Sequence, residues 1–391
     1  MEADIGDIRR LDLDSILAAS RAGTGLSEIG EPDILHGLRK LIEAYVNEAH
    51  FTPMGIEAQR GTLIRIVSNR MRVEDMFRRH PEILQEEIIG PIVITGLARS
   101  GTTKLHRMIG ASPDLQTFPL WRILHPVPLG PTPPGDKDIR ISMAEQMSAA
   151  MQQHPDFYAG HPMNPFDPDE EEWLLDMVML GYVNCHQART PSFEKWMDQQ
   201  EFSAWHPYLK KLMQLLQWQD GSPKKPWLIK APSHLRHMKL LFKTFPNAVI
   251  AHCHRNPVTT SISLASLNEA IRRMFSDYQD PPETGRFTYQ HWAKQMQGYM
   301  EARPSLERDH PFVDIAYAEL TSAVMPAIER IHAAAGFELT NEARKAMLDW
   351  ERANPQGKHG QRSYTIEHFG LTESEVRAAF ADYLQRFGNL T

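Results

Sequence analysis

One short segment limits the fold of this chain more than any other. A β-branched run at residues 91–95 is followed by a glycine-containing loop, and residues 100–109 suit a helix, so the order is strand, loop, helix. The loop glycines, Gly96 and Gly101, are spaced as in a phosphate-binding P-loop. Glycines let backbone N–H groups face an anion, and the start of a helix adds partial positive charge. The segment therefore predicts a phosphate site in an α/β fold.

The loop departs from the version of this motif that binds ATP or GTP. That version needs a lysine directly after the second glycine, where Thr102 stands here. Its absence argues against a standard nucleotide hydrolase, whose lysine reaches the β- and γ-phosphates. The loop and the helix start carry these cationic and hydroxyl side chains: Arg99, Ser100, Thr102, Thr103 and Lys104. They favour a bound phosphate over the alternative, a glycine-rich turn without a ligand.

A second group of residues predicts more cations beside this loop. Residues 227–230 and 249–253 are strand candidates joined by an amphipathic stretch, which indicates a parallel βαβ unit. Lys230 ends the first of these strands and Arg255 follows the second. The carboxyl ends of parallel strands lie at one edge of a sheet, so we expect Arg99, Lys230 and Arg255 to converge. Three cations at one edge suit a polyanion.

The rest of the chain has mainly helical periodicity, with apolar residues at steps of three and four. We expect one α/β domain over residues 1–391, with a P-loop-like parallel sheet flanked by helices. Its predicted parts are a helical N-terminal layer at 1–88, a phosphate-loop unit at 89–135, a helical insertion at 140–220, and the remaining sheet and C-terminal helices at 226–391. Smaller elements are expected as follows: a strand at 311–315, helices at 235–245, 325–335 and 341–350, and a proline-rich loop at 126–134.

Composition removes several classes of function. The 391 residues include 42 Lys and Arg against 49 Asp and Glu, a formal net charge of −7, which gives no overall attraction for nucleic acid or an anionic membrane. Cys185 and Cys253 are far apart in sequence, so a disulfide framework is not expected. The first residues lack an apolar secretory signal, and no apolar run approaches the ~20 residues of a membrane span. We expect a cytoplasmic protein whose anionic ligand is held by a local basic site.

Taken together, the patterns GLARSGTT and LIKAP…FPNA…HRNP…S resemble the sulfotransferase superfamily, in particular its bacterial branch and the tyrosylprotein sulfotransferases. The likeness is strongest over residues 91–267. It implies 3′-phosphoadenosine-5′-phosphosulfate (PAPS) as donor, 3′-phosphoadenosine-5′-phosphate (PAP) as product, and no metal. The loop of that family holds the 5′-phosphosulfate, a role that falls here on Arg99, Ser100, Gly101, Thr102 and Thr103, with Lys104 beside them.

The resemblance also implies roles outside the loop. Arg255, with Ser263 eight residues further on, corresponds to the family's site for the 3′-phosphate. Lys230 corresponds to the lysine that contacts the transferring sulfuryl group and the leaving oxygen. Lys358 and Arg362 stand in a basic stretch that resembles the family's loop closing over the nucleotide. For Lys230 the alternative is a strand-end lysine in solvent, and for Arg255 it is a structural salt bridge. For the stretch with Lys358 and Arg362 the alternative is an exposed polar loop.

The acceptor hydroxyl needs a base within hydrogen-bond reach. Arg122 stands where bacterial relatives often carry glutamate, and arginine cannot act as a base. Cytosolic members use a histidine two places after the lysine, whereas His234 comes four places after Lys230 here. We select His234 as the base, with Lys230 and Arg99 as the other predicted catalytic residues. The remaining candidates are His125, His161, Glu170, Glu171 and Glu172.

The expected reaction is O-sulfation of a small molecule. Apolar side chains of the insertion suggest a phenol, sterol or lipid alcohol, although the same side chains could pack the core: Trp173, Met177, Met179, Trp196 and Trp205. A P-loop kinase and a nucleotide-binding protein without catalysis are the alternatives. His252, Cys253 and His254 resemble metal ligands, but successive strand residues point to opposite faces, so shared ligation is not expected.

Overall fold

A four-stranded parallel sheet lies at the centre of the structure, a computed structural model that describes residues 11–31, 34–355, 358 and 364–391. The strand order is β2-β1-β3-β4. The bounds are Ile92–Gly96 for β1, Leu228–Lys230 for β2, Val249–His254 for β3 and Phe312–Ala316 for β4. The predicted strands are confirmed to within one residue at each end.

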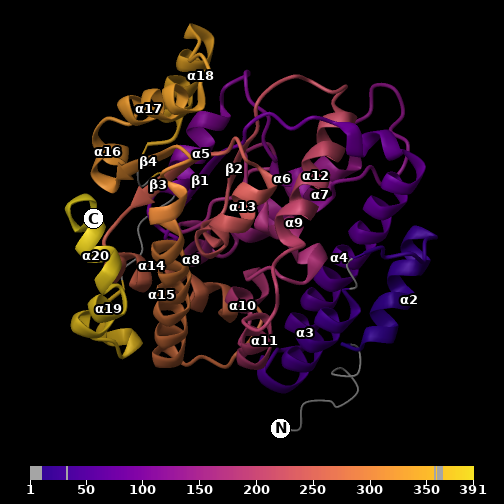
Figure 1. Ribbon diagram of the computed structural model, residues 1–391. Coiled ribbons are helices and arrows are strands. Elements are labelled where there is room, and N and C mark those ends of the chain that lie inside the picture. The colour runs from indigo at the N-terminus through magenta and orange to yellow at the C-terminus, as the bar shows by residue number, and fades with distance from the viewer. Residues whose placement is uncertain (1–10, 32–33, 356–357, 359–363) are drawn as a thin grey trace.

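Helices surround this sheet (Figure 1). The N-terminal layer contains α2 (Leu13–Thr24), α3 (Leu35–Glu48), α4 (Pro53–Arg79) and the 3₁₀ helix η1 (Pro81–Gln85). Between β1 and β2 the chain forms α5 (Thr102–Gly110), α6 (Leu120–Leu124), α7 (Ile139–Gln152), α8 (Pro155–Tyr158), α9 (Glu172–Leu175), η2 (Asp176–Val178), α10 (Val183–Gln187), α11 (Pro191–Met197) and α12 (Trp205–Gln219). The predicted helical layer and helical insertion are thus confirmed, although most helices of the insertion are short.

The later crossovers and the C-terminal part are also helical. η3 (Pro232–His237) and α13 (Met238–Thr244) join β2 to β3, where one continuous helix was expected, and α14 (Pro257–Arg273) and α15 (Pro281–Leu306) join β3 to β4. After β4 come α16 (Tyr317–Ser322), α17 (Met325–Ala335), α18 (Asn341–Ala353), η4 (Glu367–Phe369), α19 (Glu373–Ala379), α20 (Ala381–Phe387) and η5 (Gly388–Leu390). The expected α/β class is confirmed.

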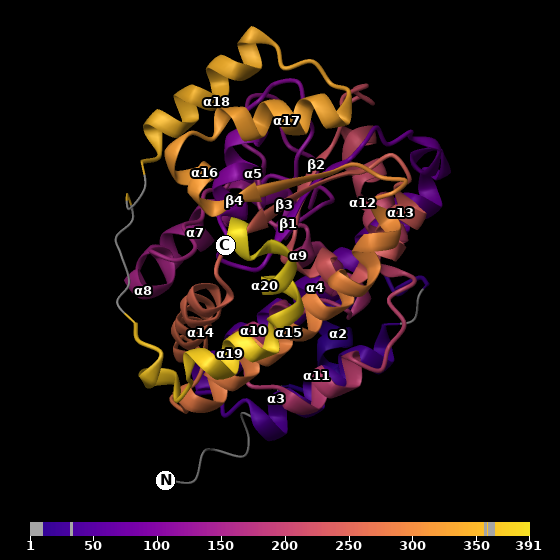
Figure 2. The same ribbon diagram turned by 60° about the vertical axis from the view of Figure 1, so that its left-hand side comes forward.

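Alternation along the strands divides the apolar core between the two faces of the sheet. Ile92 and Ile94 pack into a core shared with α5, α17 and α18, whereas Val93 packs into the larger core on the other face. Figure 2 shows α17 and α18 on one side of the sheet and α14 and α15 on the other. The sheet is therefore buried on both faces, as parallel sheets usually are.

This topology places the functional segments at one edge. Ile94 pairs with Lys230, and Gly96 pairs with Cys253, so β1, β2 and β3 end close together. After these strand ends the chain continues into the phosphate loop, the turn that follows Lys230 and the turn that contains Arg255. The predicted convergence at the carboxyl edge of the sheet is therefore built into the strand register.

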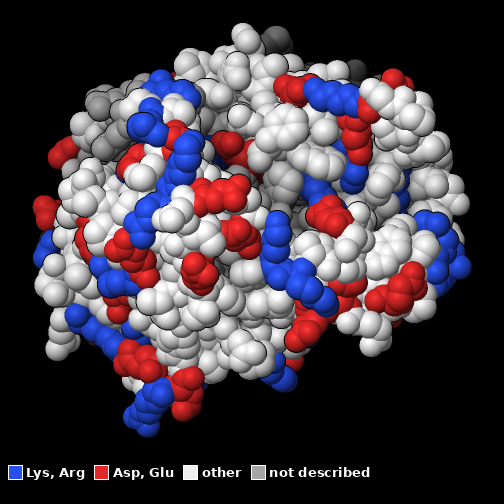
Figure 3. Space-filling model, turned by 90° about the horizontal axis from the view of Figure 1, so that it is seen from above, with Lys and Arg blue, Asp and Glu red and all other residues white. Residues whose placement is uncertain are grey.

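The surface charge is mixed on the face seen in Figure 3, where acidic and basic side chains are interspersed. Such a distribution agrees with the formal net charge of −7 and supplies no broad basic patch on that face. Among the helices within the described ranges, none is both long enough and apolar enough to cross a membrane.

Candidate active site

The phosphate loop joins β1 to α5 and requires glycine at two positions. Gly96 has a φ of 144°, and a Cβ there would lie 2.4 Å from the carbonyl oxygen of Cys253 in β3. Gly101 has a φ of 93°, a conformation that favours glycine. Arg99 also has a positive φ, 74°, which is strained for a residue with a side chain. The glycines allow the loop to lie close to the sheet edge and turn directly into the helix.

The loop presents hydrogen-bond donors suited to an anion. α5 begins without a side-chain cap, so no side chain of the described residues competes for the N–H groups of its first turn. The buried Ser100 hydroxyl has no hydrogen-bond partner within the described part of the chain. An unpaired buried hydroxyl is unfavourable, and a phosphate oxygen would supply its missing partner. The loop therefore fits a phosphate group at the N-terminus of α5.

The residues predicted for the two phosphates of the donor lie together. Arg99 Nε donates to Ser263 Oγ at 3.2 Å, and Arg255 Nη1 donates to the carbonyl oxygen of Arg99 at 2.7 Å. The Arg255 guanidinium also lies 3.9 Å from the centre of the Tyr317 ring. Burial lowers the pKa of Arg99, and the neighbouring charge of Arg255 lowers it further. A bound polyanion would relieve both effects.

Two predicted lysine ligands already have partners in the protein. Lys104 Nζ forms an ion pair of 2.8 Å with Glu351 Oε1. Lys358 is exposed and donates to two oxygens at the C-terminal end of α18, both at 3.0 Å. Arg362 lies outside the described residues. A role for these three residues in donor binding stays a prediction.

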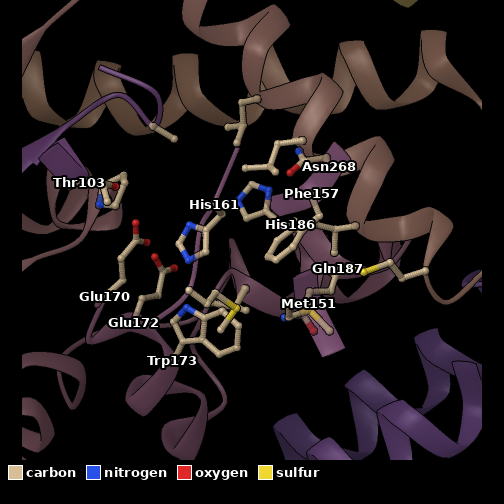
Figure 4. Close-up of a pocket in the computed structure, with 18 of the residues that line it drawn as sticks. Thr103, Met151, Phe157, His161, Glu170, Glu172, Trp173, His186, Gln187 and Asn268 are labelled. Carbon is tan, nitrogen blue, oxygen red and sulfur yellow. The ribbon is translucent and has the colours of Figure 1, made fainter. Parts of the chain in front are cut away.

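Two cavities meet at the start of α5. The first, which we call the basic cavity, runs from the loop toward α16 and α18, and its lining includes Gly101, Thr103, Lys104, Arg107, Tyr317 and Lys358. The second, the apolar cavity, has a volume of about 1330 Å³, part of it open to solvent. Thr103 lines both cavities. Figure 4 shows Thr103, Glu170 and Glu172 at one end of the apolar cavity and Gln187 and Asn268 at the other.

Lys230 lies at this meeting point. Its Nζ forms an ion pair with Glu170 and donates to Thr103 Oγ1 at 3.4 Å. Its backbone N–H donates to Glu171 Oε2 at 2.9 Å, and its side chain is only 1% exposed. Two consecutive glutamates therefore fix the backbone and the ammonium group of the same lysine. From the sequence, Glu170 and Glu171 were predicted only as part of a possible helix start and as candidates for the base.

His234 lies behind this point, in the core. Its Nε2 is 2.7 Å from Glu171 Oε1, and its Nδ1 is 3.2 Å from His206 Nε2. Both histidines are fully buried, and neither lines the apolar cavity. Burial, together with the adjacent His234, lowers the pKa of His206 far below its usual value, so His206 is neutral. Both ring nitrogens of His234 are therefore occupied within the protein.

The other base candidates differ in access to the apolar cavity. Glu172 lines it, but burial and the neighbouring glutamate raise the pKa of Glu172 to about 8. His161 also lines it and lies 3.6 Å from the Asp169 carboxylate. His125 lies outside it, and burial with nearby arginines lowers the pKa of His125 to about 4. Arg122 forms a salt bridge at 2.6 Å to an aspartate on the loop after α12.

Much of the apolar wall comes from residues of α7 and α14 that were not among the predicted acceptor residues. Of the aromatic and methionine side chains considered, Trp173 lines the cavity, whereas the following residues pack in or against the core: Met177, Met179, Trp196 and Trp205. The wall is completed by α7 and α14, through Met147, Met151, Leu264, Leu267 and Ile271 among others. For Met177, Met179, Trp196 and Trp205, core packing was therefore the correct interpretation.

A histidine cluster lies elsewhere on the sheet. The potential ligand atoms of His252, His254 and Asp314 lie within 4.8 Å of one another, while Cys253 points into the opposite core, as alternation predicts. Arg303 donates to both oxygens of Asp314, at 3.1 and 2.9 Å. The guanidinium already supplies the positive charge that a metal ion would bring. We therefore interpret the cluster as a polar network that joins β3 and β4 to α15.

Fold and site together define a P-loop-like α/β protein with a phosphate loop between two cavities. A model of the sulfotransferase family matches residues 91–341, more than half of the chain. The chain belongs to the sulfotransferase family.

Known proteins agree with this assignment. The omega-hydroxy-beta-dihydromenaquinone-9 sulfotransferases Stf3 of Mycobacterium bovis and Mycobacterium tuberculosis are each 25% identical over 191 residues, 47% of this chain and 46% of theirs. The chain thus spans about half the length of these curated relatives. Sulfotransferase STF1 from Mycobacterium tuberculosis has a TM-score of 0.78 at 26% identity, over 95% of this chain and 98% of its own. Sulfotransferase STF9 from Mycobacterium avium shares the fold, with a TM-score of 0.85 at 24% identity over 96% and 97%.

Proposed function

We propose that this chain transfers a sulfuryl group from PAPS to a hydroxyl group of an apolar small molecule. The meeting of the basic and apolar cavities at Thr103, beside Lys230 and Glu170, is the observation that carries the proposal. A donor whose phosphates lie at the loop between the cavities, and an acceptor in the apolar cavity, would bring their reacting groups to one point. The names of the curated relatives, which refer to an omega-hydroxy menaquinone, support a hydroxyl acceptor.

The donor's phosphates are assigned to the loop and to the turn after β3. The first-turn N–H groups of α5 and the unpaired Ser100 hydroxyl would hold the 5′-phosphosulfate. Arg255 and Ser263, each of which contacts Arg99 of the loop, would hold the 3′-phosphate. Two guanidinium groups held close together, one of them partly buried, suit a ligand with phosphates at two positions.

In the proposed reaction, the acceptor oxygen forms a bond to sulfur while the bond between sulfur and the phosphate oxygen breaks. The leaving phosphate gains negative charge, which the Lys230 ammonium stabilises. Glu170 takes the hydroxyl proton, in place of His234, because it is the cavity carboxylate next to Lys230. Glu172 is largely protonated at neutral pH, since its pKa is raised to about 8. The products are a sulfate ester and PAP, and Glu170 then releases its proton to solvent.

Arg255 should determine recognition of the 3′-phosphate. In the unmodified protein, PAP should bind about 100-fold more tightly than adenosine 5′-monophosphate, which lacks that phosphate. The substitution Arg255→Met should remove most of this difference while changing the affinity for the monophosphate little. Isothermal titration calorimetry with both nucleotides measures the ratio, and R255K should keep part of it. An unchanged ratio in R255M would exclude Arg255 from the donor site.

His234 should act as a positioning residue, through Glu171, rather than as the base. His234→Leu removes the donor to Glu171 and should lower kcat by about 10- to 100-fold, with PAP affinity within about threefold of normal. His234→Gln can still donate to Glu171 but cannot accept a proton at neutral pH, so it should recover most of the rate. If H234Q is as inactive as H234L while both remain folded by circular dichroism, His234 is the base after all.

A further inference from the structure

Arg65 is an arginine of the cavity wall with little to balance its charge. It projects from α4 and lines the apolar cavity. Its one hydrogen bond among the described residues is a long contact of 3.4 Å from Nη1 to the Leu124 carbonyl oxygen. No carboxylate of the described chain lies within salt-bridge distance of it. By contrast, Arg122 and Arg140 form salt bridges of 2.6 and 2.7 Å.

The surroundings of Arg65 do not neutralise its charge. Burial lowers the pKa of Arg65, and the acid that acts on it is Asp176. Burial in turn raises the pKa of Asp176 to about 7, so this carboxyl group is only partly ionised at neutral pH. The side chains around the cavity are mainly apolar, with Met147 and Met151 of α7 among them. A cation in such a wall is unfavourable unless a ligand brings the opposite charge.

Arg65 is also separate from the cations assigned to the donor. The charged and titratable groups that act on Arg99 are Tyr364, Arg255, Tyr317 and Glu170, whereas Asp176 acts on Arg65. The two arginines thus sit in different electrostatic surroundings although both line the apolar cavity. The donor phosphates are accounted for without Arg65, which leaves its charge for the acceptor.

We propose that Arg65 binds an anionic group, a carboxylate or a phosphate monoester, on the acceptor. The acceptor is then an amphiphile with its hydroxyl beside Thr103 and Glu170, an apolar body against α7 and α14, and an acidic group at α4. This inference rests on the proposed function, because it assigns the apolar cavity to the acceptor. A guanidinium forms two parallel hydrogen bonds with either group, which makes arginine the suitable side chain.

The test compares binding of matched ligands to the complex of the full chain with PAP. The first set is a chain-length series of ω-hydroxy fatty acids with their methyl esters, and the second is the corresponding alkanediols with their monophosphates. Calorimetry should show that one anionic form binds about tenfold or more tightly than its neutral partner. Arg65→Met should remove that difference by weakening the anion alone. The larger of the two differences identifies the anion as carboxylate or phosphate.

Arg72→Met is the matched control. Arg72 lies seven residues further along α4, donates to the Gly23 carbonyl oxygen at 3.2 Å and does not line the cavity, so the preference should persist in this variant. A neutral partner that binds as well as the anion, a preference that survives in R65M, or failure of every ligand to bind would overturn the inference. A ligand that binds through Arg65 but receives no sulfuryl group from PAPS would instead contradict the proposed function and leave the anion site standing.

Discussion

Replacing Lys230 with methionine is expected to lower kcat by about a thousandfold, with little change in affinity for PAP. The ammonium group is buried between Glu170 and Thr103, where the sulfuryl group is proposed to transfer. Its charge is needed most when the phosphate departs, so the substitution should weaken the transition state far more than the ground state. Single-turnover kinetics with saturating donor and acceptor measure this step apart from product release.

A second lysine provides the control for this result. Lys225 precedes β2, is exposed and donates to the Pro113 carbonyl oxygen at 2.7 Å, outside both cavities. K225M should keep kcat within about twofold, because it removes a surface charge without touching the site. A K230M variant that turns over normally, or one that loses PAP affinity in proportion to rate, would remove Lys230 from its proposed role.

Replacing Glu170 with glutamine is expected to lower kcat by about 100- to 10,000-fold, the usual range for loss of a general base. Glutamine keeps the shape of the side chain and can still accept a hydrogen bond, but it cannot take the hydroxyl proton. Single-turnover kinetics with saturating donor and acceptor measure this loss.

His161 is the alternative to Glu170 as the base, because it also lines the apolar cavity. His161→Asn should reduce kcat by less than about tenfold. The opposite pattern, with E170Q active and H161N inactive, would transfer the role of base to His161.

The phosphate loop and its cations could be predicted because they depend on local sequence and on strand direction alone. A β-branched run followed by glycines fixes β1 and its loop, and parallel strands must bring their carboxyl ends to one edge. Lys230 and Arg255 follow from the same rule. Their positions needed no knowledge of side-chain packing, and the register of β1 with β2 and β3 agrees with them.

The acid side of the site could not be predicted in the same way. Glu170 and Glu171 reach Lys230 because the segment before α9 returns from the helical insertion, a long-range contact without a sequence period. The position of His234 depends on η3, a 3₁₀ turn that directs the imidazole into the core. The spacing shows that His234 follows Lys230 closely in sequence, but it does not show which way the His234 side chain points.

The acceptor cavity was predictable only in its chemical character. Trp173 was a correct candidate, yet the apolar residues of α14 have the spacing of ordinary core residues and gave no separate signal. A helix that lines a cavity and a helix that packs the core bury the same kinds of side chain. Arg65 likewise resembles any surface arginine in the sequence until its partners are known.

The two cavities are proposed to bring a donor and an acceptor together in one transfer reaction. Incubating the chain with PAPS labelled in its sulfuryl group and a panel of apolar alcohols, phenols and ω-hydroxy acids tests it directly. We expect a labelled sulfate ester and one equivalent of PAP for each ester formed, with no transfer from ATP. Tight binding of intact PAPS without a labelled product from any acceptor, or phosphoryl transfer from ATP in its place, would contradict it.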